Sequence, residues 1–158
     1  MAIKLSQVKR LNSVHIISKR DDAVDEEQTE WDRYDEDPVN NLDAIKYHAE
    51  KEATKFICNF EQTGKEVASI KDAMIKGFDD DKNPMVAYGK WAYTVARMTL
   101  KDIQNPPNVG DVIIFKKDGK GYVTDEILTK LERLGIVQEI FQHWIHLTQD
   151  DSKPQAKN

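Results

Sequence analysis

Ten carboxylates crowd into residues 21–37, and this stretch constrains the fold more than any other feature of the sequence. Only one basic residue, Arg33, lies among them. Like charges at this density repel one another and resist burial, so the segment is expected to stay solvated. The preceding residues 1–20 carry five basic side chains and no acid. We therefore expect residues 1–41 to form a charged, extended N-terminal arm.

Two aromatic residues, Trp31 and Tyr34, lie inside the acidic stretch. A helix over residues 25–35 would place both rings on one side. Burying them would draw neighbouring carboxylates out of water, so we expect the rings to stay exposed and to contact a partner. A solvated, mobile spacer is the alternative interpretation. The residues expected to bind a partner are Trp31, Tyr34, Glu30 and Asp35, with Lys9 and Arg10 as a second contact between subunits.

The length of 158 residues suits one domain, which we place at residues 42–148, followed by a disordered tail at 149–158. Cys58 is the only cysteine, so the composition excludes a disulfide framework and a thiolate zinc site. No apolar run reaches the ~18 residues of a membrane helix, and the first residues lack the apolar stretch of a signal peptide. We expect no association with a membrane.

Three segments near the front have the patterns of extended structure. Residues 13–18 are rich in β-branched side chains. In residues 54–60, Phe56, Cys58 and Phe60 alternate with their neighbours, with the period of a half-buried strand. Residues 43–48 are a further extended candidate.

The middle of the chain has helix signals. Thr63 and Glu66 have the spacing of a capping box, which predicts a helix from there to Gly77. After a loop over residues 78–82, Asn83 and Pro84 are typical of a helix start. We therefore expect a long central helix over residues 84–104, with Trp91 largely buried.

The last third alternates strand and helix signals. Residues 109–115 predict a strand, Asp118–Gly119 a hairpin turn, and residues 122–123 a short return strand. Two helices with apolar faces are expected at residues 124–134 and 136–147. Together the elements predict an α+β fold, with small β elements and a β-hairpin packed on about four helices.

No motif in the sequence carries a recognisable chemistry. There is no phosphate-binding loop, no serine elbow and no His-Glu-x-x-His pair, and Cys58 is expected in the core. Glu139, His143 and His146 are neighbours on a helix but lack the further ligands of a metal site. The acidic loop 79–81 lacks the pattern of a calcium site. We expect a protein that is not an enzyme, without cofactor, metal or small-molecule substrate, and the pI of about 5.4 argues against nucleic-acid binding.

Several segments follow one another in a distinctive order. An extended TKFICNF precedes the helix start TGKE, the aromatic-rich AYGKWAYTVARMTLKDIQN, the hairpin-like IIFKKDGKGYV and the closing TDEILTKLERLGIVQEIFQHWIHLT. In layout and apolar spacing, residues 21–148 resemble small phage-encoded proteins of the tail-gene region, including tail assembly chaperones. Ala53 departs from that pattern, in which proline is common at this position. The family is not enzymatic, so no catalytic residue is carried over.

The resemblance implies a non-enzymatic bacteriophage morphogenesis or virion-associated protein whose partners are other phage structural or assembly proteins. A chaperone would shield apolar segments of the tail tape measure, whereas a structural subunit would lie in the neck, tail or capsid. Its location would be the host cytoplasm during assembly, or the virion. The basic and acidic stretches also predict a homo-oligomer. The alternative is a small acidic inhibitor or immunity-type protein that binds a basic nuclease or nucleic-acid enzyme.

Overall fold

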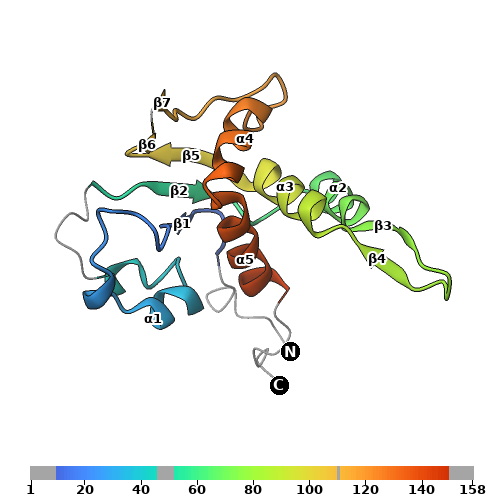
Figure 1. The fold of residues 1–158 in the computed structure, drawn as a ribbon, viewed down its shortest axis with the longest axis horizontal. Coiled ribbons are helices and arrows are strands. Elements are labelled where there is room, and N and C mark those ends of the chain that lie inside the picture. Colours follow the sequence, from blue (N-terminus) through green and yellow to red (C-terminus); the bar gives the residue numbers. More distant parts are fainter. Residues whose placement is uncertain (1–9, 46–51, 110, 150–158) are drawn as a thin grey trace, which may run out of the picture.

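The computed structural model describes residues 10–45, 52–109 and 111–149, and within them the fold is α+β, as predicted. Five α-helices pack with one three-stranded and two two-stranded antiparallel sheets (Figure 1). Lys9, residues 46–48 and most of the tail predicted at 149–158 lie outside the described residues, so the expectations for them stay predictions. The extended candidate at residues 43–48 is wrong at its start, where residues 43 and 44 belong to a 3-10 helix.

The three-stranded sheet brings together distant parts of the chain. Its strands are β1 (Val14–Ile16), β2 (Lys55–Cys58) and β5 (Leu100–Gln104), in the order β1-β2-β5. The alternation predicted for β2 is confirmed, because Phe56 and Cys58 are buried and their neighbours are not. Phe56 is paired with Ile16 on one side and with Ile103 on the other. Since β1 belongs to residues 1–41, this part of the expected arm is a strand of the main sheet.

Three helices pack on one another and form the main core together with the sheet. They are α3 (Tyr88–Thr99), α4 (Asp125–Arg133) and α5 (Ile136–Thr148), and α5 also contacts β1 (Figure 1). Gly135, at φ +75°, separates α4 from α5, and a Cβ there would collide with the guanidinium of Arg20. The largest fully buried side chains of this core include Ile16, Phe56, Leu100, Ile127, Leu128, Leu131 and Ile140.

The helix α2 (Gly64–Met74) begins with the predicted capping box, in which Thr63 accepts the N–H of Glu66 and the Glu66 carboxylate accepts that of Thr63. The long helix expected over residues 84–104 is wrong. Pro84–Val86 form the strand β4, which pairs with β3 (Ile75–Phe78), and α3 ends at Thr99 where β5 begins. Pairing with distant or neighbouring strands therefore overrides the local helix signals at both ends of α3.

The strand expected over residues 109–115 is also wrong. Instead, two short strands, β6 (Asn108–Val109) and β7 (Asp111–Val112), pair with each other in antiparallel fashion. The predicted turn at Asp118–Gly119 is present, because the Asp118 N–H donates to the Tyr122 carbonyl at 2.7 Å, and one bridge joins Lys117 to Val123. A single bridge replaces the expected return strand.

The acidic stretch is folded against the body. The one helix expected over residues 25–35 is two, the 3-10 helix η2 (Glu26–Gln28) and α1 (Trp31–Glu36), followed by η3 (Leu42–Ala44). These elements enclose a second, smaller core of Ile17, Tyr34, Ile45 and Ala53. In Figure 1 they form the lower left of the molecule, beside α5.

Candidate functional site

The buried ring of Tyr34 corrects our expectation for the acidic stretch. Tyr34 is fully buried, so the prediction that it is exposed to a partner is wrong. Its hydroxyl accepts the N–H of Ile17 at 2.7 Å and donates to the carbonyl of His15 at 2.8 Å. The carboxylates do not follow the ring inward, because α1 is amphipathic and its Asp32 and Glu36 remain exposed.

The other residues that we expected to bind a partner do not form one common surface contact, and each has different surroundings. Trp31 is half-buried with its ring edge-on to Tyr34, and the Lys19 ammonium lies 5.6 Å from the Trp31 ring centre. Lys19 also forms an ion pair of 2.7 Å with Asp35. The carboxylate of Glu30 lies 3.5 Å from Arg33. Arg10 is exposed. The contacts of Trp31 and Asp35 hold α1 against the body.

A polar pocket of about 590 Å³ lies between α1 and α5. Burial lowers the pKa of His143 to about 4 and raises the pKa of Glu139. Glu139 accepts a hydrogen bond from the Ser18 hydroxyl at 3.0 Å, and the His143 ring packs edge-on against Tyr34. No group of three potential metal ligands occurs among the described residues. Through their contacts with Ser18 and Tyr34, these two α5 side chains pack against the N-terminal segment.

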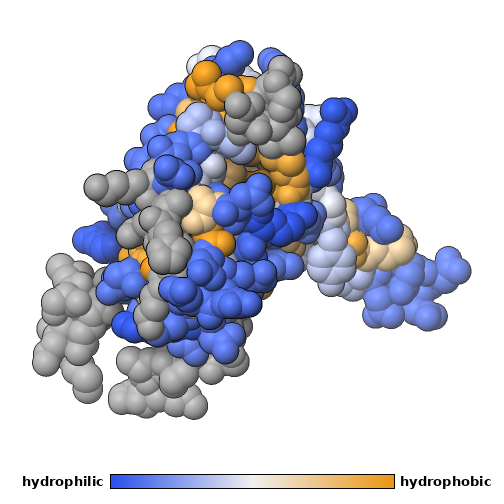
Figure 2. Space-filling view, turned by 60° about the vertical axis from the view of Figure 1, so that its left-hand side comes forward, coloured by the Kyte–Doolittle hydropathy of each residue, from blue (hydrophilic) through white to orange (hydrophobic). Residues whose placement is uncertain are grey.

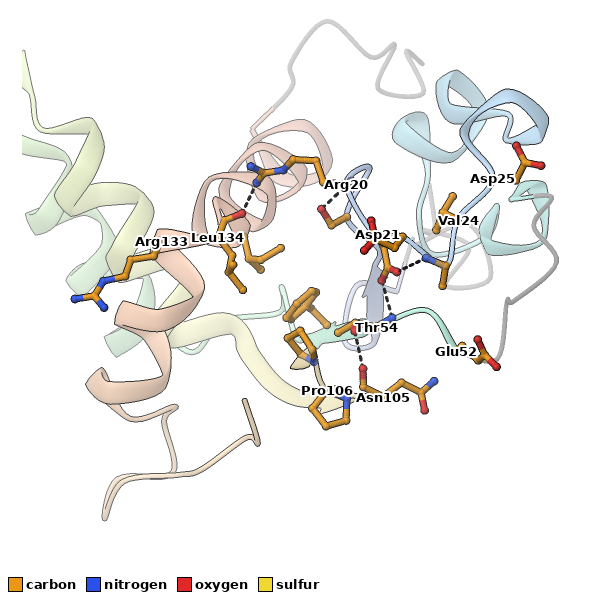
Figure 3. A pocket seen from close by; sticks show the side chains of 16 residues that line it. Arg20, Asp21, Val24, Asp25, Glu52, Thr54, Asn105, Pro106, Arg133 and Leu134 are labelled. Carbon is orange, nitrogen blue, oxygen red and sulfur yellow. Dashed lines mark hydrogen bonds between the residues drawn. The ribbon is translucent and has the colours of Figure 1, made fainter. Parts of the chain in front are cut away.

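A second pocket, of about 890 Å³, lies where residues 18–25, β2, residues 105–107 and the α4–α5 junction meet (Figure 3). Asp21 accepts the N–H groups of Ala23 at 2.9 Å and Thr54 at 2.8 Å. The Thr54 hydroxyl donates to the Asn105 carbonyl at 2.6 Å, and the Arg20 guanidinium donates to the Leu134 carbonyl. The polar groups of this pocket thus join the four segments to one another.

Cys58 is in the core, as predicted. It is fully buried, and burial raises the pKa of its thiol to about 12, so it is not a nucleophile at neutral pH. Among the described helices, none combines the length with the apolar surface needed to cross a bilayer.

The β3–β4 hairpin is the surface that stands out from the body. It projects beyond α2 and α3 in Figure 1, and its end is hydrophilic in Figure 2. Phe78, the last residue of β3, is 66% exposed, and Tyr88, just after the hairpin, is 65% exposed. Asp79 forms the turn by accepting the N–H groups of Asp81 at 3.0 Å and Asn83 at 2.8 Å. The exposed Phe78 ring gives this projecting hairpin an apolar surface that a protein partner could cover.

Sequence reasoning missed the hairpin because Asn83 and Pro84 resemble a helix start. One signal could have found it. A short polar turn over residues 79–83 separates two segments that become the strands of the hairpin, Ile75–Phe78 and Pro84–Val86.

Comparison with known proteins found no family model, no curated protein and no solved structure that matches this chain.

Proposed function

We propose that this protein acts by binding other proteins, as a non-enzymatic bacteriophage morphogenesis or virion-associated protein. The observation that carries the protein-binding part is the projecting β3–β4 hairpin with its exposed Phe78. A two-stranded hairpin is marginally stable in water by itself, and it leaves the outer edges of both strands unpaired. A partner that covers the Phe78 ring and one edge would stabilise the hairpin.

The phage part of the proposal rests on the resemblance of residues 21–148 to tail-region proteins. On this proposal the protein is in the host cytoplasm during assembly, and in the virion if it is a structural subunit. Its partners are phage structural or assembly proteins, and it needs no cofactor or small-molecule substrate.

The proposal is tested by complementation. The encoding phage, with its copy of the gene deleted, is grown on hosts that supply the wild-type protein, the Phe78→Ser variant or the Val67→Ser variant. Val67 is a matched control, because it is an apolar side chain that is 40% exposed on α2. We expect the deletion and Phe78→Ser to reduce complete particles at least tenfold and Val67→Ser to have little effect. Normal particle yield without the gene would refute the proposal. Mass spectrometry of purified particles then separates a virion subunit from a chaperone.

A second candidate, an acidic inhibitor of a basic nuclease, is favoured by one observation. The exposed carboxylates of Glu26, Glu27, Asp32 and Glu36 lie on the outer side of η2 and α1, where a basic partner could contact them. Replacing these four residues by serine would abolish inhibition on this reading, and would leave particle yield unchanged if the hairpin is the binding surface.

A further inference from the structure

A second exposed apolar surface begins at the last residue of β7. Val112 is 50% exposed and Ile114 is 56% exposed. Exposed lysines, Lys116, Lys117 and Lys120, follow them within a few residues. We call these five residues the basic patch. In Figure 1 this part of the chain lies at the top of the molecule, away from the β3–β4 hairpin at the right.

Two acids near the basic patch, Asp118 and Asp125, are engaged by other residues. Asp118 lies 3.3 Å from the Arg97 guanidinium and also accepts the N–H groups of Lys120 and Tyr122. Asp125 accepts a hydrogen bond from the Tyr93 hydroxyl at 2.9 Å. Among the described residues, no ion pair involves a lysine of the basic patch. The patch therefore presents a positive charge next to an apolar surface.

The end of the hairpin has the opposite character. Phe78 is followed by three exposed aspartates, Asp79–Asp81, and by one lysine, Lys82, which occupies the left-handed region at φ 63°. We call residues 78–82 the hairpin tip. Lys76, two residues before Phe78, is also exposed, so the negative charge is confined to the tip. The tip thus places a large apolar ring next to carboxylates.

We propose that the hairpin tip of one copy docks on the basic patch of a second copy of this chain. Phe78 would cover the surface of Val112 and Ile114, while Asp80 and Asp81 would approach the patch lysines. Both halves of this contact belong to one chain, and they match in apolar character and are opposite in charge. The inference rests on the proposed function, because it names the partner of the same hairpin.

The two surfaces are different, so the contact is head-to-tail. Each copy would use its tip on one neighbour and its patch on another, and such contacts generate rings or open filaments rather than two-fold dimers. This differs from the self-association that the sequence suggested, in which the basic residues 1–20 would meet the acidic stretch.

Charge reversal tests the pairing. One variant carries Asp80→Lys and Asp81→Lys, which spare the turn-forming Asp79, and a second carries Lys116→Glu and Lys117→Glu. A third combines all four changes. The control, Lys65→Glu with Arg133→Glu, changes the charge as much as the second variant does, at exposed residues outside both surfaces. Sedimentation velocity over a range of protein concentrations, at ~0.05 M and ~0.5 M NaCl, measures self-association. Circular dichroism and the melting temperature show that each variant is folded.

We expect the wild type and the control to self-associate, more weakly at high salt. The first two variants should associate at least tenfold more weakly, because each brings like charges together. A mixture of the first two variants should regain association, because the basic tip of one can dock on the acidic patch of the other. The four-fold variant should also regain association, because its tip is basic and its patch is acidic. A monomeric wild type, unaffected single-surface variants, or no recovery in the four-fold variant would overturn the inference.

The proposed self-association and the proposed phage function can be refuted independently of each other. A monomer whose Phe78→Ser variant still blocks particle formation would refute the second copy as partner and leave the proposed function in place. Self-association that follows the expected charge pattern, in a protein whose gene is dispensable for particles, would refute the phage function alone.

Discussion

Removing the hydroxyl of Tyr34 tests how the acidic stretch is attached to the body. In Tyr34→Phe, the N–H of Ile17 loses its acceptor and the carbonyl of His15 loses its donor. Ile17 is only 2% exposed, so water does not readily replace the lost partner. A hydrogen bond contributes about 1 kcal/mol and an unsatisfied buried group costs about 1–3 kcal/mol. We expect a loss of about 3 kcal/mol, which lowers the melting temperature by roughly 6–12 °C for a chain of this size.

The assay is urea and thermal unfolding, together with amide hydrogen exchange at Ile17. The matched control is Tyr93→Phe, because the Tyr93 hydroxyl donates to Asp125 at the surface, where water replaces the bond. The control should lose less than about 1 kcal/mol. Equal losses in the two variants, or an Ile17 amide that stays protected in Tyr34→Phe, would refute the role of the hydroxyl.

Other parts of the fold give further predictions. Burial lowers the pKa of His143 from 6.5 to about 4, so its contribution to stability is complete above pH 6.5 and is lost as the pH falls toward 4. Urea unfolding of His143→Gln between pH 7 and 4 should show a fall in stability smaller by up to ~3 kcal/mol than in wild type. Trp91→Ala should cost about 3 kcal/mol, because the half-buried ring packs on Phe141 at a centroid distance of 4.9 Å; a loss below ~1 kcal/mol would show that the contact is weak. Thr63→Ala should cost about 1 kcal/mol and expose the amide of Glu66 to hydrogen exchange.

Features that depend on neighbouring residues could be predicted from the sequence. The alternation of Phe56 and Cys58 predicted β2, because side chains of a strand alternate between two faces whatever the partner is. Thr63 and Glu66 predicted the start of α2 in the same way, since the capping box involves only four residues. The apolar spacing of residues 136–147 predicted α5 almost to its ends.

Features that depend on distant partners could not be predicted from the sequence. Leu100 and Ile103 have a spacing that suits a helix, but they belong to a strand because β2, more than 40 residues earlier, pairs with them. Our prediction for Tyr34 assumed that burying its ring would also bury the carboxylates of the acidic stretch. A helix as short as α1 separates the ring from the carboxylates by direction alone, so the desolvation cost that we expected does not arise. The exposed hairpin was missed for another reason: its two strands are neighbours in the sequence, but Asn83 and Pro84 resemble a helix start.

The contacts between the N-terminal segment and α5 have a consequence for synthesis of the chain. Ser18 bonds to Glu139, Arg20 to Leu134, and His146 to the carbonyl of Glu36, and each contact joins residues at least 110 positions apart. At a translation rate of about 5–20 residues per second, the N-terminal segment is synthesised roughly 5–20 s before α5, the helix that it contacts. During this interval Trp31 and Tyr34 have only the small second core to enter, and Tyr34 lacks its contact with His143 of α5. The carboxylates around them then oppose aggregation of the nascent chain, a role that ends once α5 has emerged from the ribosome and packed.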